Sequence, residues 1–326
     1  MPRSSRFAIA AALAVALAPT ARAADVDKLL PADAEYVVHF NLKQILDSEI
    51  IKKYALDQLK QALQGNDAQA MLKELGLDPL KDVEKITIGA SGTDQNDAKA
   101  LIMVRGNFDP DKLFKAAEAQ SKKDGDRFTM VKDGNDVMFK YQPDNGNPMY
   151  GTVVDKTTVV VATDKKIITT ASAAFAAGKA SAASKDLSAL ISKMDDKASM
   201  WVCAVTKDKL NNVKLPGGGG GMGQNIQGQL AKMDSVTVTL RVTGDISLDV
   251  NLGMATEAAA DEMGKTVEEG LGTIKGALPF LAANDERMKP LVDVVKTLKS
   301  EVKSKVVSVS AKLPGAVLGK LINMGD

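Results

Sequence analysis

Residues 235–252 read SVTVTLRVTGDISLDVNL, and this stretch decides the fold class. Polar and apolar residues alternate from Ser235 to Val242, which is typical of a strand with one buried face. A second strand-like run, 246–252, follows the short polar turn Thr243-Gly244-Asp245, so the two runs are predicted to form a β-hairpin. Its first strand has Val236, Val238, Leu240 and Val242 on one face and Thr237, Thr239 and Arg241 on the other.

Similar strand pairs recur along the chain. We expect strands at 36–42, 83–90, 98–105, 128–132, 137–141, 150–154, 158–163, 198–206 and 306–311. Helical spacing predicts helices at 51–63, 68–75, 111–122, 165–177, 257–277, 290–302 and 314–324. Because hairpins join most of the strands, the predicted fold is α+β, with mainly antiparallel sheet and helices packed on one face.

The order of these elements is similar in the two parts of the chain. Each part reads as a strand, a helical segment, a hairpin, a helix, one or more further strands and a final helix. We therefore predict a first α+β half at 24–184 and a second α+β half at 185–326. Two pseudo-repeated halves of this kind can share one continuous sheet.

The first 23 residues predict export. Arg3 and Arg6 precede an apolar run, 7–18, and Ala21-Arg22-Ala23 has the small-x-small form of a signal-peptide cleavage site. Cleavage after Ala23 would make Ala24 the first residue of a periplasmic or extracellular protein. The apolar run is shorter than the roughly 20 residues that span a bilayer, and no later run is longer, so no transmembrane segment is expected in the mature chain.

Charge and cysteine content exclude several classes of protein. The chain has 42 basic and 41 acidic residues. Removal of the three arginines before Ala24 leaves 39 against 41, a net charge of −2, which gives no general attraction for nucleic acid. The single cysteine, Cys203, excludes an intramolecular disulfide. It lies in an apolar strand-like run, so we expect a buried, inert thiol.

The chain lacks the usual catalytic and metal-binding patterns. His39 is the only histidine, which excludes an HExxH zinc helix and other multi-histidine metal sites and weighs against a serine–histidine–aspartate site. Its neighbours Val38 and Phe40 should point to the opposite face of the strand. Aspartate pairs at 109/111, 124/126 and 133/136 lack the spacing of a calcium loop and flank predicted turns or helix starts. We therefore predict no metal, no cofactor and no catalytic residue.

A glycine run is the most unusual segment of the chain. Gly218, Gly220 and Gly223 match G-x-G-x-x-G, but no buried strand precedes them, as a dinucleotide site requires. Ordering so many glycines is costly, so we predict a mobile loop at 216–223. Its glycines are Gly217, Gly218, Gly219, Gly220, Gly221 and Gly223.

Two alternative functions stay open from the sequence alone. The predicted helix 257–277 contains Gly264, Gly270, Gly272 and Gly276. Such glycines indicate close packing on a sheet, a broken helix, or a helix that moves to open an apolar cavity. The chain has 14 methionines as adaptable lining, which suits a carrier of a hydrophobic, lipid-like ligand. A hydrolase that uses two carboxylates remains a further alternative.

The opening segment also carries a resemblance. Leu30-Pro31-Ala32-Asp33-Ala34, followed by Val37-Val38-His39-Phe40-Asn41-Leu42, resembles the start of exported bacterial domain-of-unknown-function proteins with duplicated α+β halves. The resemblance implies an extracytoplasmic protein and assigns no functional residue. Together with the residues themselves, it leads us to expect a non-enzymatic binding or scaffold protein whose partner is an unidentified protein or a hydrophobic small molecule.

Overall fold

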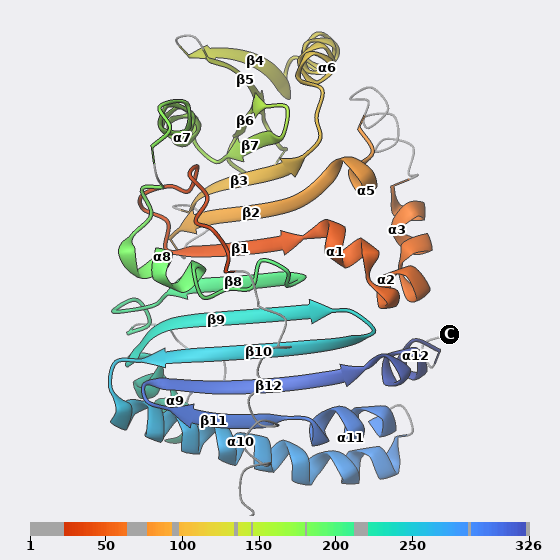
Figure 1. Ribbon diagram of the computed structural model, residues 1–326, viewed down its shortest axis with the longest axis vertical. Helices are drawn as coiled ribbons and strands as arrows, with labels where there is room; N and C mark the ends of the chain where they lie inside the picture. The colour runs from red at the N-terminus through yellow and green to blue at the C-terminus, as the bar shows by residue number, and fades with distance from the viewer. Residues whose placement is uncertain are drawn as a thin grey trace, which may run out of the picture.

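A single antiparallel sheet dominates the computed structural model, as Figure 1 shows. The structure describes residues 23–63, 77–92, 98–133, 136–144, 146–179, 181–211, 221–285 and 288–323. The twelve strands lie in the order β11-β12-β10-β9-β8-β1-β2-β3-β7-β6-β5-β4. Their bounds are β1 Tyr36–Asn41, β2 Val83–Ser91, β3 Lys99–Gly106, β4 Phe128–Asp133, β5 Asp136–Tyr141, β6 Met149–Asp155, β7 Thr158–Ala162, β8 Met200–Val205, β9 Met233–Val242, β10 Asp245–Met254, β11 Lys299–Lys303 and β12 Val306–Pro314.

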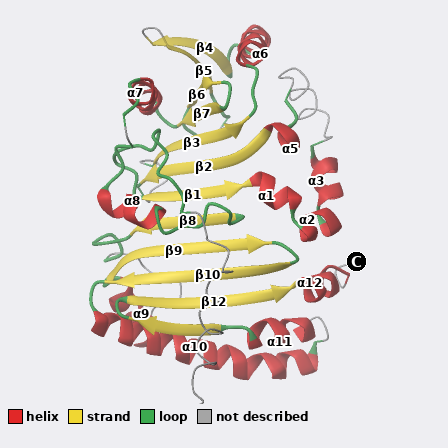
Figure 2. Ribbon diagram, in the orientation of Figure 1, coloured by secondary structure: helices red, strands yellow, loops and turns green. Residues whose placement is uncertain are grey.

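Eleven helices are present in the described ranges. They are α1 Leu42–Asp47, α2 Glu49–Tyr54, α3 Leu56–Ala62, α5 Pro79–Asp82, α6 Pro110–Lys123, α7 Lys165–Ala176, α8 Lys185–Ile191, α9 Gly221–Leu230, α10 Glu257–Asn284, α11 Lys289–Lys296 and α12 Gly315–Asn323. The α+β class and the antiparallel sheet are confirmed. Figure 2 shows α10 and α11 along the β11 edge of the sheet and α6 and α7 near the opposite edge.

The pairing of β1 with β8 joins the two parts of the chain in the middle of the sheet. His39 lies opposite Trp201, and Val38 lies opposite Val202. Because side chains alternate along a strand, these pairs define two surfaces, which we call the His39 face and the Val38 face. From this junction the strand order runs outward through β2, β3, β7 and β6 on one side and through β9, β10, β12 and β11 on the other.

Helices cover both faces of the sheet, so the prediction that they pack on one face is wrong. On the His39 face, Ile168 of α7 and Leu187 of α8 join a core with Val37 and Leu101. On the Val38 face, α10 packs through Met263 onto Val307 of β12 and its neighbours, and α6 lies over β3 and β7. The reason is that both faces of β1, β2, β3 and β7 carry apolar residues, whereas the 235–252 hairpin has one polar face.

Several helices have other bounds than predicted, and one was not predicted. Residues 51–63 belong to the short helices α2 and α3, and the predicted helix 68–75 lies outside the described residues. The predicted helix 290–302 ends at Lys296, and Lys299–Lys303 forms β11. Residues 298 and 302 fit helical spacing, but Val302 pairs with Val307 across a turn at Ser304, whose φ is +54°. The helix α8 has no counterpart among the predicted elements.

The loop predicted over the glycine run does not extend to residue 223. The helix α9 begins at Gly221, so the predicted loop is wrong at Gly221 and Gly223, and residues 216–220 lie outside the described ranges. Tertiary packing overrides the low helix propensity of glycine here. Gln229 Nε2 of α9 donates to Thr266 Oγ1 of α10 at 2.9 Å, and Leu230 packs against the methionine cluster under α10.

The glycines of α10 serve different purposes. A Cβ added at Gly264 would overlap Val302 Cγ2, which is the close packing that one of our interpretations expected. Added Cβ atoms at Gly270, Gly272 and Gly276 would meet nothing within 4 Å. Close approach to the sheet therefore explains only Gly264. Within the described ranges, no helix is both long and apolar enough to cross a membrane.

Candidate functional site

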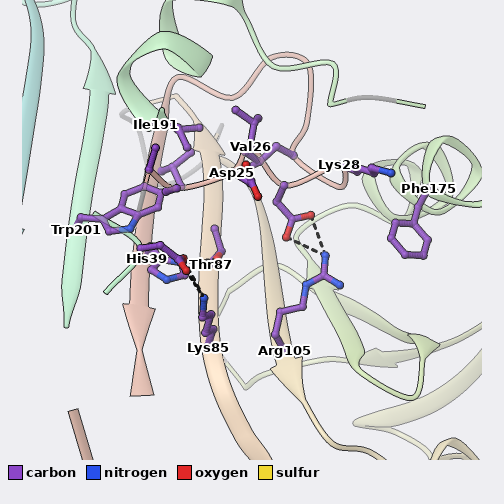
Figure 3. Close-up of a pocket in the computed structure, with 16 residues that line it drawn as sticks. Asp25, Val26, Lys28, His39, Lys85, Thr87, Arg105, Phe175, Ile191 and Trp201 are labelled. Carbon is purple, nitrogen blue, oxygen red and sulfur yellow. Dashed lines mark hydrogen bonds and ion pairs between the residues drawn. The ribbon is translucent and has the colours of Figure 1, made fainter. Parts of the chain in front are cut away.

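A pocket of about 570 Å³ opens on the His39 face beside the β1–β8 junction. Figure 3 shows its arrangement: His39, Lys85 and Arg105 come from β1, β2 and β3, and Trp201 comes from β8. The chain segment 23–30 forms another wall, while Phe175 of α7 and Ile191 of α8 complete the lining. The site thus combines residues that lie between positions 23 and 201 of the sequence. Because these residues are far apart in the chain, no local sequence motif predicts the site.

His39 and Trp201 form a stacked pair in the wall of the pocket. Their ring centroids are 4.9 Å apart with an interplanar angle of 16°. His39 Nδ1 and the Thr87 hydroxyl share a hydrogen bond of 2.8 Å. His39 is 6% exposed and Trp201 is 3% exposed. Among the described residues, neither His39 Nε2 nor Trp201 Nε1 has a hydrogen-bond partner, and a buried polar group left in this way costs about 1–3 kcal/mol.

Two ion pairs hold charged side chains at the same pocket. Arg105 Nη2 contacts both carboxylate oxygens of Asp27, at 3.0 and 2.9 Å. Lys85 Nζ contacts both carboxylate oxygens of Asp196, at 2.9 and 3.1 Å. All four side chains are about one-third exposed or less. Because each pair joins two separate segments of the chain, the pairs fix the wall 23–30 and the loop after α8 against the sheet.

The imidazole of His39 is held in its neutral form. Burial, and after it the positive charge of Lys85, lowers the pKa of His39 from 6.5 to about 4. The carboxylates of Asp196 and Asp27 act in the opposite direction and do not compensate. At neutral pH, His39 is therefore a polar, uncharged part of the pocket wall.

The pocket lining combines charged side chains with apolar ones. Its ionisable lining residues balance in charge, with Asp25, Asp27 and Asp196 against Lys28, Lys85 and Arg105. Apolar side chains such as Val26, Phe175 and Ile191 lie beside them. Concave sites of roughly 300–1,000 Å³ with apolar walls and a few polar groups are typical of small-molecule binding.

The thiol near the pocket is buried, and two of the pocket carboxylates are held in ion pairs. Cys203 is buried, and burial raises the pKa of its thiol to about 12, so it is not a ready nucleophile. Asp27 is paired with Arg105, and Asp196 is paired with Lys85. In the described ranges, no three His, Cys, Asp or Glu side chains gather as a metal site.

Some of the residues singled out from the sequence line this pocket, and others lie elsewhere in the structure. The predicted cleavage residues, Ala23 and Ala24, line the pocket, and His39 and Trp201 are brought together in it. Asp109 instead caps α6 through Lys112 N, and Asp133 pairs with Lys165. The polar site residues that we did not single out include Asp27, Lys85, Thr87, Arg105 and Asp196. The sequence of β2 contained a usable signal. Lys85 and Thr87 alternate with isoleucines there, and this alternation indicates that one face of the strand is polar.

A second, apolar cavity of about 270 Å³ lies on the Val38 face under α6. Of the described residues that line it, twelve are apolar and one, Gln120, is polar. Ala116 and Ala117 of α6 face Val104, Val159 and Val161 of the sheet across it. None of its described lining residues belongs to the glycine-bearing helix α10, where one interpretation of the sequence placed an apolar cavity.

No family model matches this chain, and comparisons with curated proteins and with solved structures likewise give no match.

Proposed function

We propose that this chain is an exported, non-enzymatic binding protein whose ligand is a small amphipathic molecule held in the pocket on the His39 face. The observation that carries the proposal is the stacked His39–Trp201 pair, which places two buried, unpartnered nitrogens in side chains that line a pocket of about 570 Å³. Native proteins leave few buried polar groups without a partner. A polar ligand supplies the missing partners, and the neighbouring apolar residues accommodate its apolar part.

We infer that the pocket lies between two duplicated halves, 24–184 and 185–326. The outward strand order supports this, because β1-β2-β3-β7-β6 on one side corresponds to β8-β9-β10-β12-β11 on the other. Trp201, Ile191 and Asp196 then come from the second half, and the lining residues from Ala24 to Phe175 come from the first, while Ala23 belongs to the segment before it. Export to the periplasm or the extracellular space, by removal of residues 1–23, is part of the same proposal.

Trp201 gives a direct test, because it is the only tryptophan in the chain. We expect a saturable change in its fluorescence when the exported protein is titrated with at least one of hexanoate, hexylamine and hexanol. Val26→Phe, which fills the pocket, should raise the dissociation constant by about tenfold or more. The matched control is Ala116→Phe, in the apolar cavity under α6, which should leave the response unchanged. A wild-type protein that responds to none of the three probes would refute the proposed function.

The apolar cavity under α6 supports a second candidate function, that of a carrier of a hydrophobic ligand. Its lining is almost entirely aliphatic and aromatic, and apolar cavities of this kind bind apolar molecules rather than water. Solvent extraction of the exported protein, followed by mass spectrometry, should release an apolar molecule. Ala116→Phe should reduce its amount by about tenfold or more, and Val26→Phe should not. Absence of such a molecule from the wild-type extract would exclude this candidate.

A further inference from the structure

The segment around Ala24 is anchored in the pocket wall. Ala24 N donates to the carbonyl oxygen of Met194 at 2.9 Å, and Ala23 forms an isolated bridge with Asp195. Ala24 is 5% exposed and packs in the core cluster with Trp201, whereas Ala23 is exposed. The position of the Ala24 nitrogen is therefore set by its partner on the loop after α8.

Cleavage after Ala23 would change the chemistry of this nitrogen. Water adds to the carbonyl carbon of Ala23, the bond to Ala24 N breaks, Ala23 leaves as a carboxylate, and the freed nitrogen takes up protons to become an ammonium group. A signal peptidase is the class of enzyme that supplies this step. A free α-amino group has an ordinary pKa of about 8, so it is mostly charged at neutral pH.

The new cation would face the pocket. Ala23 itself is one of the lining residues, so its departure leaves the Ala24 nitrogen next to the vacated volume. One N–H is already directed at Met194 O, and the ammonium group has two further donors. The ionisable lining residues balance before cleavage, with three carboxylates against three cations. The ammonium group therefore makes the net formal charge of the pocket +1.

We propose that the processed amino terminus at Ala24 is a cationic ligand-binding group of the pocket, which directs the site toward amphipathic molecules that carry a carboxylate. The inference rests on the proposed function and names the ligand class of the same site. Lys28 reinforces the preference, since it also lines the pocket and forms no ion pair with any described residue.

The test uses the protein as a bacterial host exports it, with Ala24 confirmed as the first residue by mass spectrometry. The matched variant has one alanine inserted directly after Ala23. Its mature chain is one residue longer, so the amino group moves by about 3.5 Å. We expect acetylation of the α-amino group to be about tenfold slower in the wild-type protein than in the longer chain, because Met194 O holds the wild-type group in place. Hexanoate should bind the wild-type protein about tenfold more tightly, whereas hexanol should bind both equally.

Each outcome is decisive. Equal acetylation rates in the two proteins, or equal affinities for hexanoate, would overturn the inference even if hexanoate bound well, and the proposed function would then stand without it. Recovery of a processed chain that begins at another residue would also overturn it. If hexanoate, hexylamine and hexanol all fail to bind, the proposed function is wrong and the inference falls with it; the acetylation rates then report only whether the ammonium group is held at Met194 O.

Discussion

The folded protein is expected to lose about 3 kcal/mol of stability between pH 6.5 and pH 4 through His39 alone. The pKa of the imidazole is lowered to about 4 in the folded state by burial and by Lys85, and it returns to 6.5 in the unfolded chain. The unfolded state therefore binds more protons in this window, and stability falls as the pH falls. The contribution is fully present above pH 6.5 and is lost progressively toward pH 4.

Urea denaturation across this pH range measures the effect. His39→Gln removes the only histidine in the chain and keeps a hydrogen-bonding group near Thr87. Its free energy of unfolding should vary much less between pH 6.5 and pH 4.5, because the carboxylates with lowered pKa values, such as that of Asp155, lose their contribution mainly below this range. A variant as acid-sensitive as the wild type would show that another group, and not His39, is responsible.

Replacing Gly106 with alanine should destabilise the protein by about 3 kcal/mol or more. Gly106 lies at the end of β3 opposite Val83, where the register of the β2–β3 pair shifts. A Cβ at this position would overlap the backbone carbonyl oxygen of Asp82, which accepts a hydrogen bond from Asn107 N at 2.8 Å. Backbone cannot move aside as a flexible side chain can, so the strand pairing itself must be disturbed.

The matched control for this variant is Gly270→Ala in α10. An added Cβ there meets nothing within 4 Å, and alanine is favoured over glycine inside a helix by up to about 1 kcal/mol. The same substitution should therefore stabilise the protein at one position and strongly destabilise it at the other, as measured by thermal or chemical denaturation. Similar small effects at both positions would mean that the β2–β3 end tolerates the extra atom.

The local character of the fold was predictable because it depends on neighbouring residues. The hairpin of β9 and β10, the Asp109 cap of α6 and the end of α7 near Gly178 all follow from short patterns, and the structure confirms them. Where local patterns are ambiguous, tertiary contacts decided the outcome. Residues 299–303 pair with β12 instead of continuing a helix, and α9 begins within a glycine run because its later residues pack on α10.

The candidate site could not be predicted, because it depends on which strands become neighbours. His39 and Trp201 are 162 positions apart in the chain, and the pairing of β1 with β8 alone makes them stack. The ion pairs of the pocket arise in the same way. Asp27 pairs with Arg105, and Asp196 pairs with Lys85, and the two cations lie on adjacent strands. None of these residues forms a recognisable motif with its neighbours in the sequence.

The sequence by itself determined the class of the fold, the strands and turns of the hairpins, and a chain with one histidine, one cysteine and a predicted cleavage point before Ala24. Those features depend on side-chain alternation, turn chemistry and composition, which act over a few residues. The tertiary structure alone decided the strand order, the covering of both sheet faces and the pocket at the β1–β8 junction. These depend on contacts between distant segments, whose free energies are fixed only when the whole sheet has formed.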